Sequence, residues 1–248
     1  MIYKRRQCIS VSESPPPDGG LSITSAAGFK VLTRRSNPLS ASSILTGKPS
    51  DGRLRIRAAD AVCQVLRQYC HGSRILCAGI GNPAVTPDSL GPRCIANLIA
   101  SPDTTPALFT LTPDVPARTG LDTASLIRAA ADLAQADCII TVDALAARSE
   151  SSLASLIQIT DHGTAPGSGT SESVSSAITS QTMGIPVISV GVPTVIESGD
   201  LLVTPADCDF ITDLFAKILS RGILCALFRS GNCLPQREIP PEADIESL

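Results

Sequence analysis

The chain of 248 residues contains no tryptophan, and aromatic residues make up only 3% of it. Proteins that bind single-stranded nucleic acid stack bases on aromatic side chains, and this composition offers no such platform. Charged residues are also scarce, at 17%, and the formal net charge is −3. This charge balance lacks the basic footprint of a nucleic-acid-binding domain, so we expect no direct nucleic-acid partner.

The sequence also lacks a run of about 18 apolar residues, which a membrane-spanning helix needs. The basic residues after Met1 are not followed by an apolar stretch, so we expect neither a signal peptide nor a membrane partner. There are only two histidines, and nine cysteines that form no C-x-x-C pair. This pattern favours free thiols in a reducing compartment, and we expect a cytoplasmic protein that uses no metal or other cofactor.

Three regions differ in composition. Residues 1–50 are interrupted by a triple proline at 15–17, which indicates an N-terminal arm or propeptide-like segment. Residues 51–234 alternate between apolar strand-like and amphipathic helix-like segments, which predicts one α/β domain. Residues 235–248 are rich in proline and acidic residues, which predicts a mobile tail.

Within the α/β domain, the hydrophobic periodicity predicts an order of elements. The expected strands are 74–80, 107–111, 137–142, 156–160 and 186–192, and the expected helices are 55–72, 86–100, 122–135 and 207–227. Strands that alternate with helices form a parallel sheet covered on both faces. We therefore predict a three-layer α/β/α sandwich with a mostly parallel sheet.

Two carboxylates follow apolar strand segments. Asp88 lies in the polar segment after the expected strand at 74–80, and Asp143 directly follows the apolar run at 137–142. In open α/β sheets, ligands bind beyond the carboxyl ends of the strands, so both residues are candidate catalytic groups. Two carboxylates that share one water or one scissile bond can perform acid–base hydrolysis.

Structural roles remain open for both residues. Asp88 stands in the first turn of an expected helix, where the helix dipole stabilises an acid. Asp143 precedes Arg148, which can form a structural ion pair with it. The segment 79–84 superficially matches the dinucleotide-binding pattern G-x-G-x-x-A, but prolines interrupt it and no acidic residue follows at a strand end.

A third polar cluster, residues 161–169, follows another expected strand. It contains His162 and Ser168, which with an aspartate are the residue types of a Ser/His/Asp triad, although the G-x-S-x-G elbow is absent. Asp88, Asp143 and His162 also supply three ligands of the types that hold a divalent metal. Both readings remain alternatives to a two-aspartate site.

Taken together, these segments resemble the germination protease of spore-forming bacteria over most of residues 45–230. The family's G-x-G-N…T-P-D-A-L-G-P motif is matched by residues 79–92, with Ser89 in place of alanine. Its I-D-A-L-A-x-R motif is matched by residues 142–148. Its D-T-G-x-x-P-G-S-G motif is matched by residues 161–169, with His162 in place of threonine. Further matches lie at residues 47–52, 184–195 and 202–209.

The resemblance implies an aspartic-type endopeptidase that begins the degradation of small acid-soluble spore proteins during germination. It places the family's two catalytic residues at Asp88 and Asp143, one acting as base on water and the other as acid, without assigning which. It also implies a fold similar to the hydrogenase maturation peptidases, a tetrameric zymogen and a location in the spore core or forespore. The auxiliary or substrate-binding candidates are Asn82, Arg148, Asp161, His162 and Ser168.

The chain departs from the family pattern at three places. Other residues stand at 6–10, where the family has its N-terminal R-T-D-L-A motif, and at 171–173, where the family has a basic stretch. A long segment of the family is represented here only by the short segment 196–201. We therefore expect slow or absent self-cleavage. Two alternatives stay open: a catalytically silent paralogue that binds spore proteins or a partner protease, and a metal-assisted maturation peptidase.

Overall fold

The computed structural model describes residues 2–4, 21–26, 29–37, 40–46, 52–147, 149–165, 176–198 and 201–228. The strands in these ranges are β1 (Ile2–Lys4), β2 (Leu21–Ala26), β3 (Phe29–Asn37), β4 (Ser40–Thr46), β5 (Arg74–Gly79), β6 (Ala107–Leu111), β7 (Cys138–Ala147), β8 (Leu156–Thr160), β9 (Val187–Ser198) and β10 (Leu201–Val203). The helices are α1 (Gly52–Tyr69), α2 (Leu90–Ala96), α3 (Pro116–Thr119), α4 (Thr123–Ala134), α5 (Ser180–Met183) and α6 (Cys208–Phe228), and the 3-10 turns are η1 (Thr86–Asp88) and η2 (Glu150–Ser152).

All the described strands belong to one mixed sheet, with the order β2-β3-β4-β8-β9-β7-β5-β6 and with β10 and β1 added beside β9. The strands β6, β5, β7 and β9 are parallel neighbours. The strands β8, β4, β3 and β2 continue the sheet in antiparallel pairs. Every residue of Ile75–Ala78 and Cys138–Val142 is buried, as expected for parallel strands that are covered on both faces.

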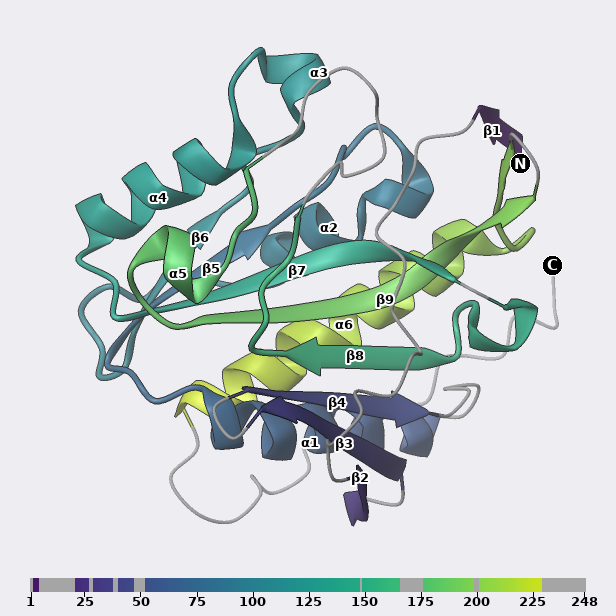
Figure 1. Cartoon of the computed structure of the whole chain (residues 1–248), viewed down its shortest axis with the longest axis horizontal. Coiled ribbons are helices and arrows are strands. Elements are labelled where there is room, and N and C mark those ends of the chain that lie inside the picture. Colours follow the sequence, from purple (N-terminus) through teal and green to yellow (C-terminus); the bar gives the residue numbers. More distant parts are fainter. Residues whose placement is uncertain are drawn as a thin grey trace, which may run out of the picture.

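Helices cover the two faces of the sheet (Figure 1). The helices α1, α2 and α6 pack on one face, where Leu66 and Leu219 join a single large apolar cluster. On the opposite face α4 packs Ile127 against Ile139 of β7. Full burial of each such side chain contributes about 1.5–3 kcal/mol to folding. The predicted three-layer α/β/α architecture is confirmed.

The boundaries of two elements differ from the sequence prediction. The helix expected at 86–100 is divided into η1 and α2, because Pro92 has no backbone N–H to continue the helical ladder back to Asp88. The strand β7 extends to Ala147 because β9 pairs with it from Ile139 through Ala147. Asp143 therefore lies inside a strand, and the expectation that it follows the strand end is wrong.

The terminal regions are only partly described. Within residues 1–50, the strands β2, β3 and β4 form a meander that joins β8, and β1 pairs with β10. The separable role of this region as an arm stays a prediction, and residues 235–248 lie outside the described part of the chain. No helix among the described residues has both the length and the apolar character to cross a membrane.

Candidate active site

The turn after β5 and the middle of β7 bring Asp88 and Asp143 close to each other. Gly79 on β5 pairs with Val142 on β7, and the Ile80 N–H donates a hydrogen bond to the Val142 carbonyl at 2.8 Å. The next residue of β7 is Asp143, while the chain that leaves β5 folds back through η1 to place Asp88. The two carboxylates are near enough for the charge of Asp88 to act on Asp143.

Asp143 is a buried carboxyl, with 9% of its surface exposed. Its Oδ1 accepts a hydrogen bond from the Ala144 N–H at 2.8 Å, and its Oδ2 accepts one from the Thr164 hydroxyl at 3.5 Å. Burial, reinforced by the negative charge of Asp88, raises the pKa of Asp143 to about 7, although these two hydrogen bonds act in the opposite direction. Asp143 can therefore hold a proton near neutral pH.

Asp88 is half-buried and is held by the backbone around it. Its Oδ2 accepts a hydrogen bond from the Asn82 N–H at 2.8 Å, which favours the ionised carboxylate. Gly81 adopts a φ of +121°, and a Cβ at this position would overlap the Asp88 carbonyl. Glycine is required there because only a residue without a side chain adopts that conformation and leaves room for the close approach.

Asn82 connects Asp88 to a residue that the sequence pattern did not identify. Its buried side-chain Oδ1 accepts hydrogen bonds from the Ala84 N–H and from Arg118 Nη1, both at 2.9 Å. Arg118 lies on α3, and its Nη1 is 3.4 Å from Asp114 Oδ2. The predicted auxiliary residue Asn82 thus fixes the loop that presents its own N–H to Asp88.

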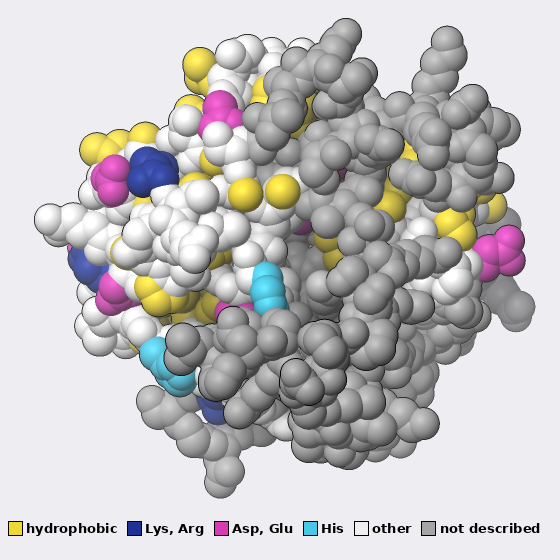
Figure 2. Space-filling model, viewed as in Figure 1, with side chains coloured by type: hydrophobic (Ala, Val, Ile, Leu, Met, Phe, Trp, Pro, Cys, Tyr) yellow, Lys and Arg dark blue, Asp and Glu magenta, His cyan; other side chains and the backbone are white. Residues whose placement is uncertain are grey.

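None of the described contacts of His162 is with Asp88 or Asp143. Its Nδ1 lies 2.8 Å from Thr160 Oγ1 and 3.3 Å from Asp161 Oδ1, so Asp161 and His162 form a local pair. Both histidines of the chain, His71 and His162, are exposed. Figure 2 shows histidine side chains at the molecular surface, on a face with few cationic side chains among the coloured residues. Within the described part of this loop, Thr164 reaches Asp143.

The alternatives built on the third cluster gain no support from this arrangement. Among the described residues, no group of three or more His, Cys, Asp or Glu side chains is arranged to hold a metal ion. The geometry therefore does not assemble Asp88, Asp143 and His162 into a metal site. Two other candidates, Arg148 and Ser168, lie outside the described residues, so neither an ion pair with Asp143 nor a serine triad is described.

A row of residues leads from Asp143 across the sheet. In the strand register, Asp143 of β7 stands beside Gly191 of β9, which stands beside Gln158 of β8. In the preceding row of the same face, the Thr141 hydroxyl donates to Ser189 Oγ at 2.8 Å. The buried Oε1 of Gln158 has no hydrogen-bond partner among the described residues. This face of the sheet is thus polar around Asp143.

Comparison with known proteins identifies relatives of this chain. Residues 56–200 match the family model described as germination protease. A germination protease from Caldanaerobacter subterraneus subsp. tengcongensis is 32% identical over 225 residues, which cover 79% of this chain and 66% of that protein. A germination protease from Priestia megaterium is 37% identical over 153 residues, which cover 57% of this chain and 40% of the relative.

The matches do not extend over the whole relatives. A germination protease from Clostridium acetobutylicum is 30% identical over 213 residues, covering 62% of this chain and 65% of that protein. The chain thus spans between 40% and 66% of the length of these three relatives. Among solved structures, the NiFe hydrogenase maturation protease HycI from Thermococcus kodakarensis is 20% identical, with a TM-score of 0.40, and the match covers 62% of this chain and 98% of HycI.

Proposed function

This chain belongs to the germination protease family, and from that premise we propose that it is an aspartic-type endopeptidase whose catalytic pair is Asp88 and Asp143. The observation that carries the proposal is a buried carboxyl whose pKa is raised to about 7 beside a second carboxylate. Two neighbouring carboxyl groups hold one proton between them, because like charges oppose the ionisation of both. Such a pair supplies a base and an acid at the same time.

The surroundings of the two residues favour one assignment of roles. Asp88 accepts a backbone N–H from Asn82, which stabilises its charge and suits it to remove a proton from water. Asp143 is buried and retains its proton more readily, which suits it to donate to the carbonyl oxygen or to the leaving amine. Water adds to the peptide carbon as Asp88 takes its proton, and the C–N bond breaks as the proton of Asp143 goes to the leaving amine. Transfer of the proton from Asp88 to Asp143 then restores the pair.

We further propose small acid-soluble spore proteins as the substrates, in the cytoplasm of the spore. This part of the proposal is supported by family membership and by the matched motifs around both aspartates. The tetrameric assembly and the zymogen state of the resembled family remain proposals for this chain. The chain matches only part of each relative's length, so the activity of the whole relatives is likewise a proposal for this chain.

A second candidate function is a catalytically silent paralogue that binds spore proteins or a partner protease. The observations that favour it are the replacement of the basic stretch at residues 171–173 and the short segment at residues 196–201. Both departures lie next to matched motifs, where they can alter binding of a long substrate while leaving Asp88 and Asp143 in place.

One incubation separates these functions. The purified full chain is mixed with a small acid-soluble spore protein, with and without a strong chelator, and the products are followed by mass spectrometry. Cleavage that survives chelation is the expected result. Binding without cleavage would favour the silent paralogue, and cleavage that stops with chelator and returns with a divalent metal would favour the metal-assisted peptidase.

A further inference from the structure

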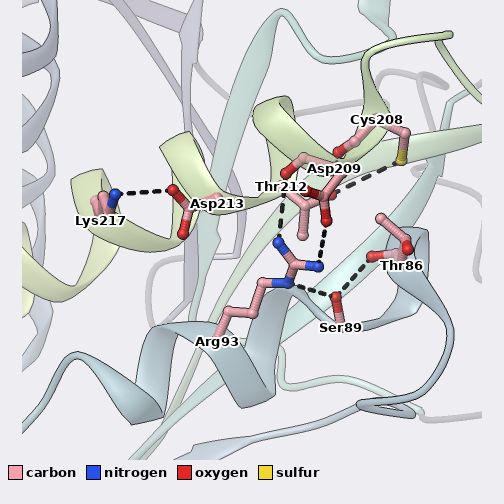
Figure 3. Close-up of polar contacts among 8 residues, drawn as sticks. All are labelled: Thr86, Ser89, Arg93, Cys208, Asp209, Thr212, Asp213 and Lys217. Atoms are coloured by element: carbon pink, nitrogen blue, oxygen red, sulfur yellow. Dashed lines mark hydrogen bonds and ion pairs between the residues drawn. The ribbon is translucent and has the colours of Figure 1, made fainter.

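A polar network outside the carboxylate pair joins the turn η1 to the start of α6 (Figure 3). The Ser89 hydroxyl donates to the Thr86 carbonyl at 2.7 Å, and Arg93 Nε donates to Ser89 Oγ at 2.9 Å. At the other end, Arg93 Nη2 lies 2.6 Å from Asp209 Oδ1 on α6. Thr86 begins η1 and Ser89 directly follows Asp88, so the network holds both flanks of the proposed catalytic residue.

The two ends of this network differ in exposure. Ser89 is 1% exposed, whereas the side chains of Arg93 and Asp209 are 30% and 77% exposed. An ion pair with so exposed a carboxylate adds little to the free energy of folding. The ion pair instead fixes the orientation of the Arg93 guanidinium. Because this group is planar, the contact of Nη2 with Asp209 also directs Nε toward Ser89.

The opposite side of η1 is held by the sheet. The Thr194 hydroxyl on β9 donates to the Pro87 carbonyl at 2.7 Å. The carbonyls of Thr86 and Pro87 are therefore bound by side chains that come from different layers of the fold. With one of these contacts removed, the turn keeps the other contact and the bond from the Asn82 N–H to the Asp88 carboxylate. We expect this weaker set of contacts to let the Asp88 carboxylate shift relative to Asp143.

We propose that Arg93 and Asp209 are positioning residues for Asp88, through which the start of α6 sets the orientation of the catalytic turn. The proposal rests on the proposed function of Asp88 and Asp143 and deepens it. Neither residue takes part in the chemistry. They act through Ser89 on the placement of Asp88, and a displacement of about 1 Å in a reacting group can lower the rate roughly a hundredfold.

The test uses the full chain with Asp209→Asn, Arg93→Gln and Arg93→Lys. The matched control is Asp213→Asn, which removes the partner of Lys217, another exposed ion pair of 2.8 Å on α6 (Figure 3). Two measurements are made on each variant. Kinetics give kcat and KM for cleavage of a small acid-soluble spore protein, and a carbon-detected NMR titration gives the pKa of the Asp143 carboxyl.

For Asp209→Asn and Arg93→Gln we expect kcat to fall at least roughly tenfold while KM stays within about twofold, because positioning and not binding is lost. We also expect the pKa of Asp143 to fall toward the ordinary carboxyl range, since Asp88, which helps to raise it, moves away. Arg93→Lys keeps the charge but not the planar fork, and it should remain impaired. Asp213→Asn should match the wild type in both measurements.

Three results would overturn the proposal: an unchanged Asp143 titration in both network variants, a KM that rises while kcat is retained, or full activity in Arg93→Lys. Asp209 is exposed, so its variant is expected to fold even if Arg93→Gln does not. The titration needs no turnover. If the wild type proves unable to cleave, the proposed function fails, and the Asp143 titration in the variants still decides whether the network positions Asp88.

Discussion

Thr194 donates its hydroxyl to the carbonyl of Pro87 across 107 positions of sequence, at a distance of 2.7 Å. This buried bond ties the strand β9 to the turn that ends in Asp88. A buried carbonyl without a partner costs about 1–3 kcal/mol, so the contact contributes to stability as well as to the placement of Asp88.

Thr194→Val is therefore expected to lower the free energy of unfolding by about 1–3 kcal/mol, because it leaves the Pro87 carbonyl buried and unpaired. Urea denaturation measures this change. Thr194→Ser keeps the hydroxyl and serves as the control, and it should recover most of the lost stability. Equal stability of the valine variant and the wild type would show that the Pro87 carbonyl finds another donor.

Asp88→Asn and Asp143→Asn should each abolish cleavage of a small acid-soluble spore protein while the fold is retained. The reason is that an amide can neither accept a proton from water as the base nor deliver one as the acid. Activity is followed by mass spectrometry and the fold by circular dichroism. Full activity in either folded variant would refute the two-aspartate mechanism.

Asp88 and Asp143 could be named as candidate catalytic residues from sequence because each lies in a contiguous motif beside an apolar strand, and their catalytic role stays a prediction. The contacts that place them could not be predicted. Thr164 and Thr194 lie in the matched segments 161–169 and 184–195, but the sequence does not show which of their side chains reach Asp143 and the turn. Arg118 lies outside every matched segment. The position of Asp143 within β7 was also missed, because the pairing of β7 with β9 determines where the strand ends. The layer architecture followed from hydrophobic periodicity alone.

The free energy of unfolding should depend on pH through Asp143. Its pKa in the folded protein is about 7, above the value of about 3.9 for an unfolded aspartate. The folded state thus binds the proton more tightly, and the stability that this gives is fully present below about pH 4 and is lost as the pH rises toward 7.

Asp143→Asn removes this dependence, so the wild type should lose stability relative to the variant as the pH is raised from about 4 to about 7. Urea denaturation of both proteins at several pH values gives the difference directly. A difference that stays constant over this range would mean that Asp143 has an ordinary pKa, and the assignment of Asp143 as the acid would then be lost.

Gln158→Leu should raise stability. The Oε1 of Gln158 is buried without a hydrogen-bond partner among the described residues, and native proteins leave few such groups unsatisfied. A buried polar group without a partner destabilises the fold by about 1–3 kcal/mol, and an apolar side chain of similar size removes this effect. The measured gain is smaller by any packing that the new side chain loses.

The control for this change is Gln64→Leu on the exposed side of α1, where the side chain is solvated and the substitution should be nearly neutral. Thermal unfolding and urea denaturation of both variants provide the comparison. A gain of stability in Gln158→Leu that is absent in Gln64→Leu would show that the Gln158 amide lowers the stability of the folded protein. Gln158 stands beside Gly191, which stands beside Asp143 in the strand register. A clear loss of stability in Gln158→Leu would contradict this prediction, because it would show that the Gln158 amide is hydrogen-bonded in the folded protein.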